Sequence, residues 1–265
     1  MGKATDFTFK EDQLFRELRD GVLILTLNRP GSYNAWTSAL RAELEKIFID
    51  AETDDTVSAI VVTGHGDKAF CAGQELAEIE RITGRREIAI LLKRLFDCYD
   101  AIRTCTKPLV AALNGVAAGS GFQLAQMCDY VVAHPGVRMG QPEVKSGLPS
   151  IFGTWLMSER VGSRAYELSL QGRLMDAEEG KQLGFVNEIV PESDVLEAAL
   201  TAARRLASQP RDAFRHSKIA NRRLNQQRYE MARDMALESY EDSFDAAAPQ
   251  KEISQFFNRP KSVDR

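Results

Sequence analysis

Short apolar segments that alternate with amphipathic ones constrain the fold of this chain more than any other feature. Residues 22–27 and 58–63 are apolar on both faces, which is typical of strands that are covered on both sides. Residues 85–103 are amphipathic at helical spacing, and 109–113 and 130–133 resemble further buried strands. A helix between the first two strands is predicted by the spacing of Leu40, Leu44, Ile47, Phe48 and Ala51. This order predicts an α/β fold with right-handed crossovers and a mainly parallel sheet.

The pattern changes after residue 160, where only residues 185–190 still resemble a strand. Asp176 and Glu179 have the spacing of a capping box, and Gly184 is typical of a helix stop. From residue 192 the sequence is helical nearly to its end. We therefore predict a core of residues 1–191 and a helical region of residues 192–265 that packs on its own core or on a neighbouring subunit.

Composition limits the partners of the chain. The 34 basic and 38 acidic side chains leave a net charge of −4, so no overall field attracts nucleic acid or an anionic membrane. No apolar run has the length of a membrane span or of a signal peptide, and we expect a cytoplasmic enzyme. The cysteines form no CxxC pair and have no clustered histidines, which argues against a metal site and against disulfides: Cys71, Cys98, Cys105 and Cys128.

A glycine-rich segment, residues 114–123, precedes a short amphipathic run at 122–127. Gly115, Gly119 and Gly121 permit tight turns and a close approach of the backbone to a ligand. The free N–H groups at a helix start, with the positive end of the helix dipole, stabilise an oxygen that becomes negative during a reaction. The segment therefore predicts a backbone site for an enolate or a tetrahedral oxyanion.

Two rival motifs fail on this segment. A dinucleotide-binding GxGxxG would need a third glycine where Leu124 stands. A nucleophile elbow, GxSxG, would need glycines on both sides of Ser120, but Ala118 and Phe122 occupy these positions. The backbone N–H of Ser120 is therefore of more interest than its hydroxyl.

Glu143, in the segment Gly140–Gln141–Pro142–Glu143, is the candidate acid/base. It is either a solvated loop acid that follows a proline or a catalytic carboxylate whose pKa is raised by apolar neighbours. A second feature also has two interpretations. Four basic residues share one helical face, which is either a phosphate or RNA surface or a solvated or intersubunit face: Arg211, Arg215, Lys218 and Arg222. The negative overall charge favours the latter.

The segments 107–129 and 140–147 together resemble the crotonase (enoyl-CoA hydratase/isomerase) superfamily. Further segments agree in order and spacing: residues 28–30 with 34–35, residues 69–76, residues 170–172, Ala177 and residues 184–187. The likeness covers roughly residues 8–260. It implies a repeated ββα spiral core with a helical C-terminal trimerisation region, assembled as a homotrimer or a dimer of trimers. It also implies an acyl-CoA thioester as ligand, with coenzyme A as part of the substrate and no separate cofactor or metal.

The resemblance also assigns roles to individual residues. The backbone N–H groups of Gln74 and Ser120 would form the oxyanion hole for the thioester oxygen, and Glu143 and Gln123 occupy the catalytic positions. The implied substrate-binding residues are Arg29, Ala72, Gly73, Gly119, Gly121, Phe152, Phe256 and Arg259. Phe152 and the nearby Trp155 either shape the acyl pocket or pack in the core.

Position 123 decides which reaction the resemblance favours. Hydratases of this family typically carry glutamates at the positions of both Gln123 and Glu143, whereas Δ3,Δ2-enoyl-CoA isomerases work with one glutamate at the second position. An amide cannot ionise at physiological pH, so one proton-transfer group is missing here. We therefore expect isomerisation. The alternatives are hydration with Gln123 orienting the water, decarboxylation or thioester hydrolysis and, in a different class, a non-catalytic or RNA-binding protein of the same fold.

Overall fold

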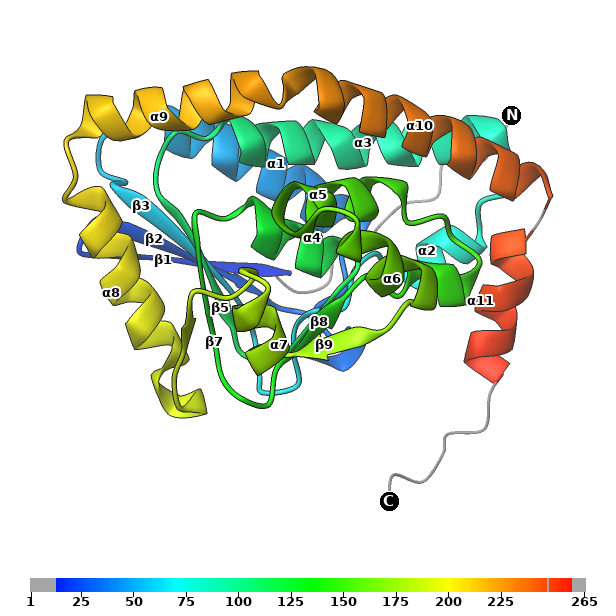
Figure 1. The fold of residues 1–265 in the computed structure, drawn as a ribbon, viewed down its shortest axis with the longest axis horizontal. Coiled ribbons are helices and arrows are strands. Elements are labelled where there is room, and N and C mark those ends of the chain that lie inside the picture. Colours follow the sequence, from blue (N-terminus) through cyan, green and yellow to red (C-terminus); the bar gives the residue numbers. More distant parts are fainter. Residues whose placement is uncertain (1–12, 247, 259–265) are drawn as a thin grey trace, which may run out of the picture.

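The computed structural model describes residues 13–246 and 248–258, which form two β-sheets covered by helices (Figure 1). The larger described sheet has the order β1-β2-β3-β5-β7-β10, in which only β1 is antiparallel to its neighbour. Its strands are β1 (Leu14–Arg19), β2 (Val22–Leu27), β3 (Ala59–Gly64), β5 (Leu109–Leu113), β7 (Tyr130–Ala133) and β10 (Glu188–Ile189). The smaller described sheet runs β4 (Ala69–Cys71), β6 (Val116–Ala118), β8 (Arg138–Gly140) and β9 (Leu174–Asp176), with β9 antiparallel.

Helices lie on both faces of the larger sheet. One face packs against α1 (Ser38–Thr53) and α3 (Arg85–Thr104), and the other against α8 (Val195–Ala207). Both faces of β2, β3 and β5 are therefore buried, which is why these strands lack polar alternation. The predicted strands at 22–27, 109–113 and 130–133 are confirmed, and the one predicted at 58–63 is displaced by one residue.

Shorter helices connect and flank these layers. They are η1 (Pro30–Ser32), α2 (Leu76–Glu80), α4 (Ser120–Met127), η2 (Glu143–Ser146), α5 (Ile151–Val161), α6 (Arg164–Gln171), α7 (Ala177–Gln182) and η3 (Glu192–Asp194). One half of the capping box predicted for α7 is present: the Asp176 carboxylate accepts a hydrogen bond from the backbone N–H of Glu179 at 2.8 Å, whereas the Glu179 carboxylate pairs with Arg173.

The strand predicted at 185–190 is shorter than expected. Only Glu188 and Ile189 pair with β7. The backbone N–H groups of Phe185 and Val186 instead donate to the carbonyl of Gly180 in α7, and both side chains are buried. Their apolar character therefore reflects the packing of the helix end and not strand pairing.

The C-terminal helices pack on their own core. After α8 come α9 (Arg211–Leu224), α10 (Gln226–Asp245) and α11 (Ala248–Asn258), and α10 lies along α3 (Figure 1). Two contacts fix that pairing: Tyr229 donates to Asp100 at 2.6 Å, and Arg85 forms ion pairs with Asp242 and Asp245. α10 and α3 therefore run in opposite directions. The predicted boundary at residue 191 falls between β10 and η3.

The basic face of α9 also contacts the core. Lys218 donates to the carbonyl of Lys107 and to the Asp129 carboxylate at 2.7 Å, and Arg222 reaches the carbonyl of Thr104. These contacts favour a packing role for the basic face over an RNA surface. Of the helices described, none is long and apolar enough to cross a membrane.

Candidate active site

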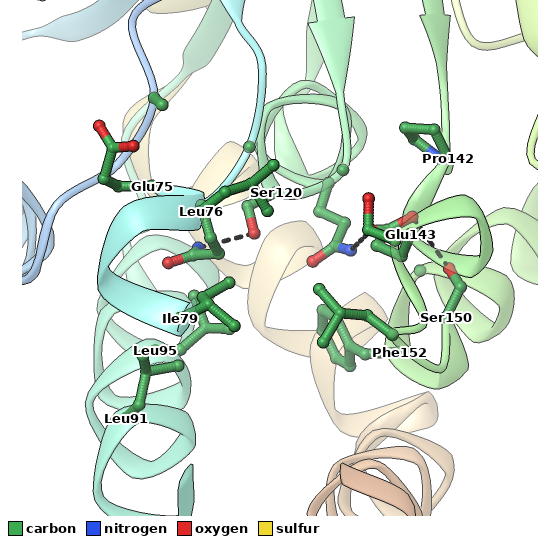
Figure 2. A pocket seen from close by; sticks show the side chains of 18 of the residues that line it. Glu75, Leu76, Ile79, Leu91, Leu95, Ser120, Pro142, Glu143, Ser150 and Phe152 are labelled. Carbon is green, nitrogen blue, oxygen red and sulfur yellow. Dashed lines mark hydrogen bonds between the residues drawn. The ribbon is translucent and has the colours of Figure 1, made fainter. Parts of the chain in front are cut away.

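A cavity of about 560 Å³ opens between the loops that follow the smaller sheet and helices α2, α3, α5 and α10. Figure 2 shows Ile79, Leu91 and Leu95 on one side of it and Glu143 and Phe152 on the other. Most of the residues predicted to form the site line this cavity: Ala72, Gly73, Gln74, Gly119, Ser120, Gln123, Glu143 and Phe152.

The loop around Gln74 and the start of α4 meet at one end of the cavity. The backbone of Trp36 bonds to Gly73 and Glu75, on either side of Gln74, at 2.7 and 2.9 Å. In a parallel bridge of this kind, the N–H of Gln74 points away from Trp36. Ser120 is the first residue of α4, so its N–H has no acceptor within the helix. Neither N–H donates a hydrogen bond among those found in the described residues, which supports the predicted pair of oxyanion donors.

Two glycines allow this close approach. Gly73 and Gly119 have φ of 105° and 54°, a backbone conformation that side chains disfavour. A Cβ at Gly73 would lie 3.2 Å from the carbonyl oxygen of Ala118, and one at Gly119 would lie 3.2 Å from Oε1 of Glu143. Glycine at 119 thus leaves the space beside the carboxylate open.

The side chain of Gln74 is held by two contacts that the sequence did not indicate. Its Nε2 donates to Ser120 Oγ at 2.7 Å, and its Oε1 accepts a hydrogen bond from Arg41. Arg41 is 1% exposed and also pairs with Glu78. Burial lowers the pKa of Arg41 from its usual value. This buried guanidinium holds the loop that carries Gln74, whose N–H is the first of the two predicted oxyanion donors.

Glu143 begins η2, directly after Pro142, with its carboxylate at the cavity wall. Its Oε2 accepts from Ser150 Oγ at 3.3 Å, and its Oε1 accepts from Gln123 Nε2 at 3.2 Å. Burial raises the pKa of Glu143 from 4.5 to about 7, against the smaller lowering effects of a backbone hydrogen bond and of these two side-chain hydrogen bonds. Both protonation states of Glu143 are therefore populated near neutral pH. This matches the predicted direction of the shift.

Gln123 is 6% exposed, and both ends of its amide are occupied. Tyr99 donates its phenol proton to Gln123 Oε1, while Nε2 donates to Glu143 and to Gln141 Oε1 at 3.0 Å. These bonds hold the Gln123 amide in place beside the Glu143 carboxylate. Tyr99 counted in the sequence only as one more residue on the apolar face of a helix, so its contact with position 123 was not predicted.

Gln141 completes this arrangement, although the sequence assigned it no role. The residue is fully buried, and one terminal atom of its amide lies 2.6 Å from Glu143 Oε1. The Gln141 amide has two possible orientations. With its nitrogen in this place, it donates to the ionised Glu143 carboxylate; with its oxygen there, it accepts from Gln123 and from the protonated Glu143. A Cβ at Gly153 would lie 2.4 Å from this amide, so α5 must carry glycine there.

Some predicted binding residues lie elsewhere. The Arg29 guanidinium bonds to the carbonyl of Ala35 at 2.7 Å and to Glu75 at 2.8 Å, behind the cavity wall. Gly121 does not line the cavity; a Cβ there would lie 2.1 Å from the carbonyl oxygen of Cys71, so the glycine allows α4 to pack on β4. The side chain of Phe256 and the whole of Arg259 lie outside the described residues.

Phe152 both lines the cavity and packs in the hydrophobic core. The side chain is 5% exposed, lines the cavity and stacks on Tyr99 with ring centroids 5.1 Å apart. Trp155 packs behind it at 5.3 Å. Cys71 is completely buried, and burial raises the pKa of its thiol to about 12, which does not suit a nucleophile. Within residues 13–246 and 248–258, no group of three His, Cys, Asp or Glu side chains is placed to hold a metal ion.

Comparisons with known proteins show which family this chain resembles. The model of the enoyl-CoA hydratase/isomerase family matches residues 17–263. A probable enoyl-CoA hydratase of Rhizobium meliloti is 36% identical over 199 residues, which cover 74% of this chain and 76% of the relative. The short-chain-enoyl-CoA hydratase of Clostridium acetobutylicum is 31% identical over 245 residues, which cover 91% and 92%. The crystal structure of carnitinyl-CoA hydratase from Mycobacterium avium superposes with a TM-score of 0.82 at 28% identity and covers 97% of this chain and 99% of its own.

The family match and the shared fold together define the class of the protein. The chain belongs to the enoyl-CoA hydratase/isomerase (crotonase) family. The predicted crotonase-like α/β core with C-terminal helices is thereby confirmed.

Proposed function

We propose that this protein is an acyl-CoA enzyme that moves a double bond, converting a 3-enoyl-CoA into a 2-enoyl-CoA. The observation that carries the proposal is the single carboxylate beside the oxyanion donors. Glu143 has a pKa of about 7, which suits a group that first accepts and then donates a proton. The other described carboxylate at the cavity wall, Glu75, is held by Arg29 at 2.8 Å.

The proposed reaction needs only one base. The thioester oxygen accepts hydrogen bonds from the N–H groups of Gln74 and Ser120, while the Glu143 carboxylate removes a proton from Cα. The electron pair of the broken C–H bond forms the dienolate, whose negative oxygen the two donors stabilise by several kcal/mol, on the order of 3 each. The protonated Glu143 then returns the proton to Cγ, and the double bond moves into conjugation with the thioester.

Hydration is the second candidate, because both curated relatives described above bear hydratase names. In that reaction Gln123 would have to orient a water molecule. Its Oε1 already accepts from Tyr99 and its Nε2 already donates to Glu143, so the amide would have to exchange one of these bonds for water. This requirement is why we place isomerisation first.

We further propose that the chain assembles as a homotrimer or a dimer of trimers through its helical region, residues 192–265. Large apolar side chains on α9 and α10 remain exposed on the monomer, which supports a partner surface in this region: Leu224 at 83%, Met231 at 59% and Met235 at 50%.

The experiment that tests the function is turnover of the purified protein on matched CoA esters. A 3-enoyl-CoA and the 2-enoyl-CoA of equal length separate the two candidates, since isomerisation consumes the first and hydration the second. We expect consumption of the 3-enoyl ester with formation of the 2-enoyl ester. Rapid hydration of the 2-enoyl ester without isomerisation would overturn the first choice, and a lack of turnover on both would overturn both candidates.

A further inference from the structure

The cavity extends beyond the reacting groups into an apolar chamber. Apart from Tyr99 at the reacting end, the described wall residues on α2 and α3 are hydrocarbon side chains: Leu76, Ile79, Ile88, Leu91, Leu92, Leu95 and Phe96. Figure 2 shows Ile79, Leu91 and Leu95 leading away from Ser120. Beyond Tyr99, whose hydroxyl donates to Gln123, the described lining residues of these two helices offer no hydrogen-bond partner to a substrate group.

The chamber follows one face of α3. Residues 88, 91, 92, 95 and 99 recur at spacings of three and four, which places them in a row along the helix. Tyr99 contacts Gln123 at the reacting end of the row, and Ile88 lies at the other end. At 1.5 Å per residue the row is about 16 Å long, which matches an extended acyl chain of roughly a dozen carbons.

Charge limits the chemistry of the occupant. The charged side chains among the described lining residues are Glu75, Glu143 and Lys145, all outside the α3 row. A carboxylate or quaternary amine on the acyl tail would be buried there without a partner, which is strongly unfavourable. The chamber therefore suits an uncharged chain.

α10 supplies the opposite wall through Ala236 and Tyr240. The contacts of Tyr229 with Asp100 and of Asp242 with Arg85 fix the antiparallel register of α10 on α3. Ala236 lies about midway along α10 between Tyr229 and Asp242, which places it opposite the middle of the row. Ala236 is 2% exposed, and its small side chain leaves room that a larger one would fill.

We propose that the enzyme is selective for uncharged acyl chains of about eight to twelve carbons, a length set by the row on α3, and that Ala236 determines how long a chain is accepted. This inference rests on the proposed acyl-CoA function. Each methylene that enters the chamber is removed from water, so binding strengthens with chain length until the chamber is filled.

The test compares wild type with Ala236→Phe and with a control, Ala246→Phe, at an exposed position after the end of α10. Binding of saturated butyryl-, octanoyl-, decanoyl- and glutaryl-CoA is measured by calorimetry, and kcat/KM is measured on 3-enoyl-CoA esters of the same lengths. In wild type we expect decanoyl-CoA to bind at least about tenfold more tightly than butyryl-CoA, and glutaryl-CoA to bind no better than butyryl-CoA.

Ala236→Phe should lose at least about tenfold in affinity and kcat/KM for the ten-carbon ester and change less than about threefold for the four-carbon ester. Ala246→Phe should behave as wild type. Equal affinity for all lengths, tighter binding of the glutaryl ester, or an equal loss at every length in Ala236→Phe would overturn the inference. Length-dependent binding without turnover would instead refute the proposed reaction and leave the chamber assignment intact.

Discussion

Replacing Glu143 with glutamine removes a titrating group from the cavity wall while nearly preserving its shape. The pKa of Glu143 is raised from 4.5 to about 7, so the folded protein binds this proton more tightly than the unfolded chain does. The stability that the neutral acid contributes is fully present below about pH 4.5 and is lost as the pH rises through about 7. The pKa shift corresponds to a change of about 3 kcal/mol at most in the free energy of unfolding.

Glu143→Gln cannot titrate, so its stability lacks this pH dependence. We expect the free energy of unfolding of Glu143→Gln, relative to wild type, to rise by about 2 to 3 kcal/mol between pH 5 and pH 8. Urea unfolding across this range measures the difference. Glu178→Gln, at an exposed position on α7, is the matched control for the loss of a carboxylate from the surface.

The same variant tests the chemistry. Wild-type kcat/KM should rise with pH up to about 7, as the base form of Glu143 becomes populated. Glu143→Gln should lose roughly 10²- to 10⁴-fold in turnover while it still binds CoA esters. A stability difference that stays constant from pH 5 to pH 8 would refute the argument from burial, and retained turnover would show that another group carries the proton.

Two further substitutions test the site and its scaffold. Gln123→Glu restores a second carboxylate and should raise the hydration rate of a 2-enoyl-CoA, measured in a coupled assay. The gain should fall short of the rate of an enzyme built around two glutamates, because neighbouring acids perturb each other's pKa values. Unchanged hydration would show that position 123 does not select the reaction. Gly121→Ala places a methyl group 2.1 Å from the carbonyl oxygen of Cys71 and should lower the free energy of unfolding by at least about 2 kcal/mol. Gly31→Ala, with no atom within 4 Å of the added Cβ, is its control, and equal stability of the two variants would contradict this account.

The sequence predicted those parts of the fold that repeat a local pattern. Strands β2, β5 and β7 carry unbroken apolar runs because both of their faces are buried. The smaller sheet was not visible as a pattern, since β4, β6 and β8 are three residues long and too short to show a period. They were accessible only through the family resemblance.

The candidate site divides in the same way. Glu143 and the glycine-rich segment were predicted because each lies in a contiguous motif. Tyr99 and Arg41 were missed because their partners are distant in sequence: Tyr99 bonds to Gln123, and Arg41 bonds to Gln74. In a helical sequence pattern, neither residue differs from its neighbours in a way that reveals a distant partner. Gln141 lay inside a recognised motif, but the sequence did not show that its buried amide contacts both Gln123 and Glu143.

The packing of α10 along α3 brings a late segment of the chain into the wall of the chamber. The groups proposed to handle the proton and the oxyanion lie in the first part of the chain, up to Glu143, whereas Ala236 and Tyr240 of the chamber lie near its end. Mutations in the codons for α10 can therefore alter which substrate fits without altering the atoms that react with it. Related enzymes with this architecture can therefore keep the same reacting groups while their substrate specificities diverge.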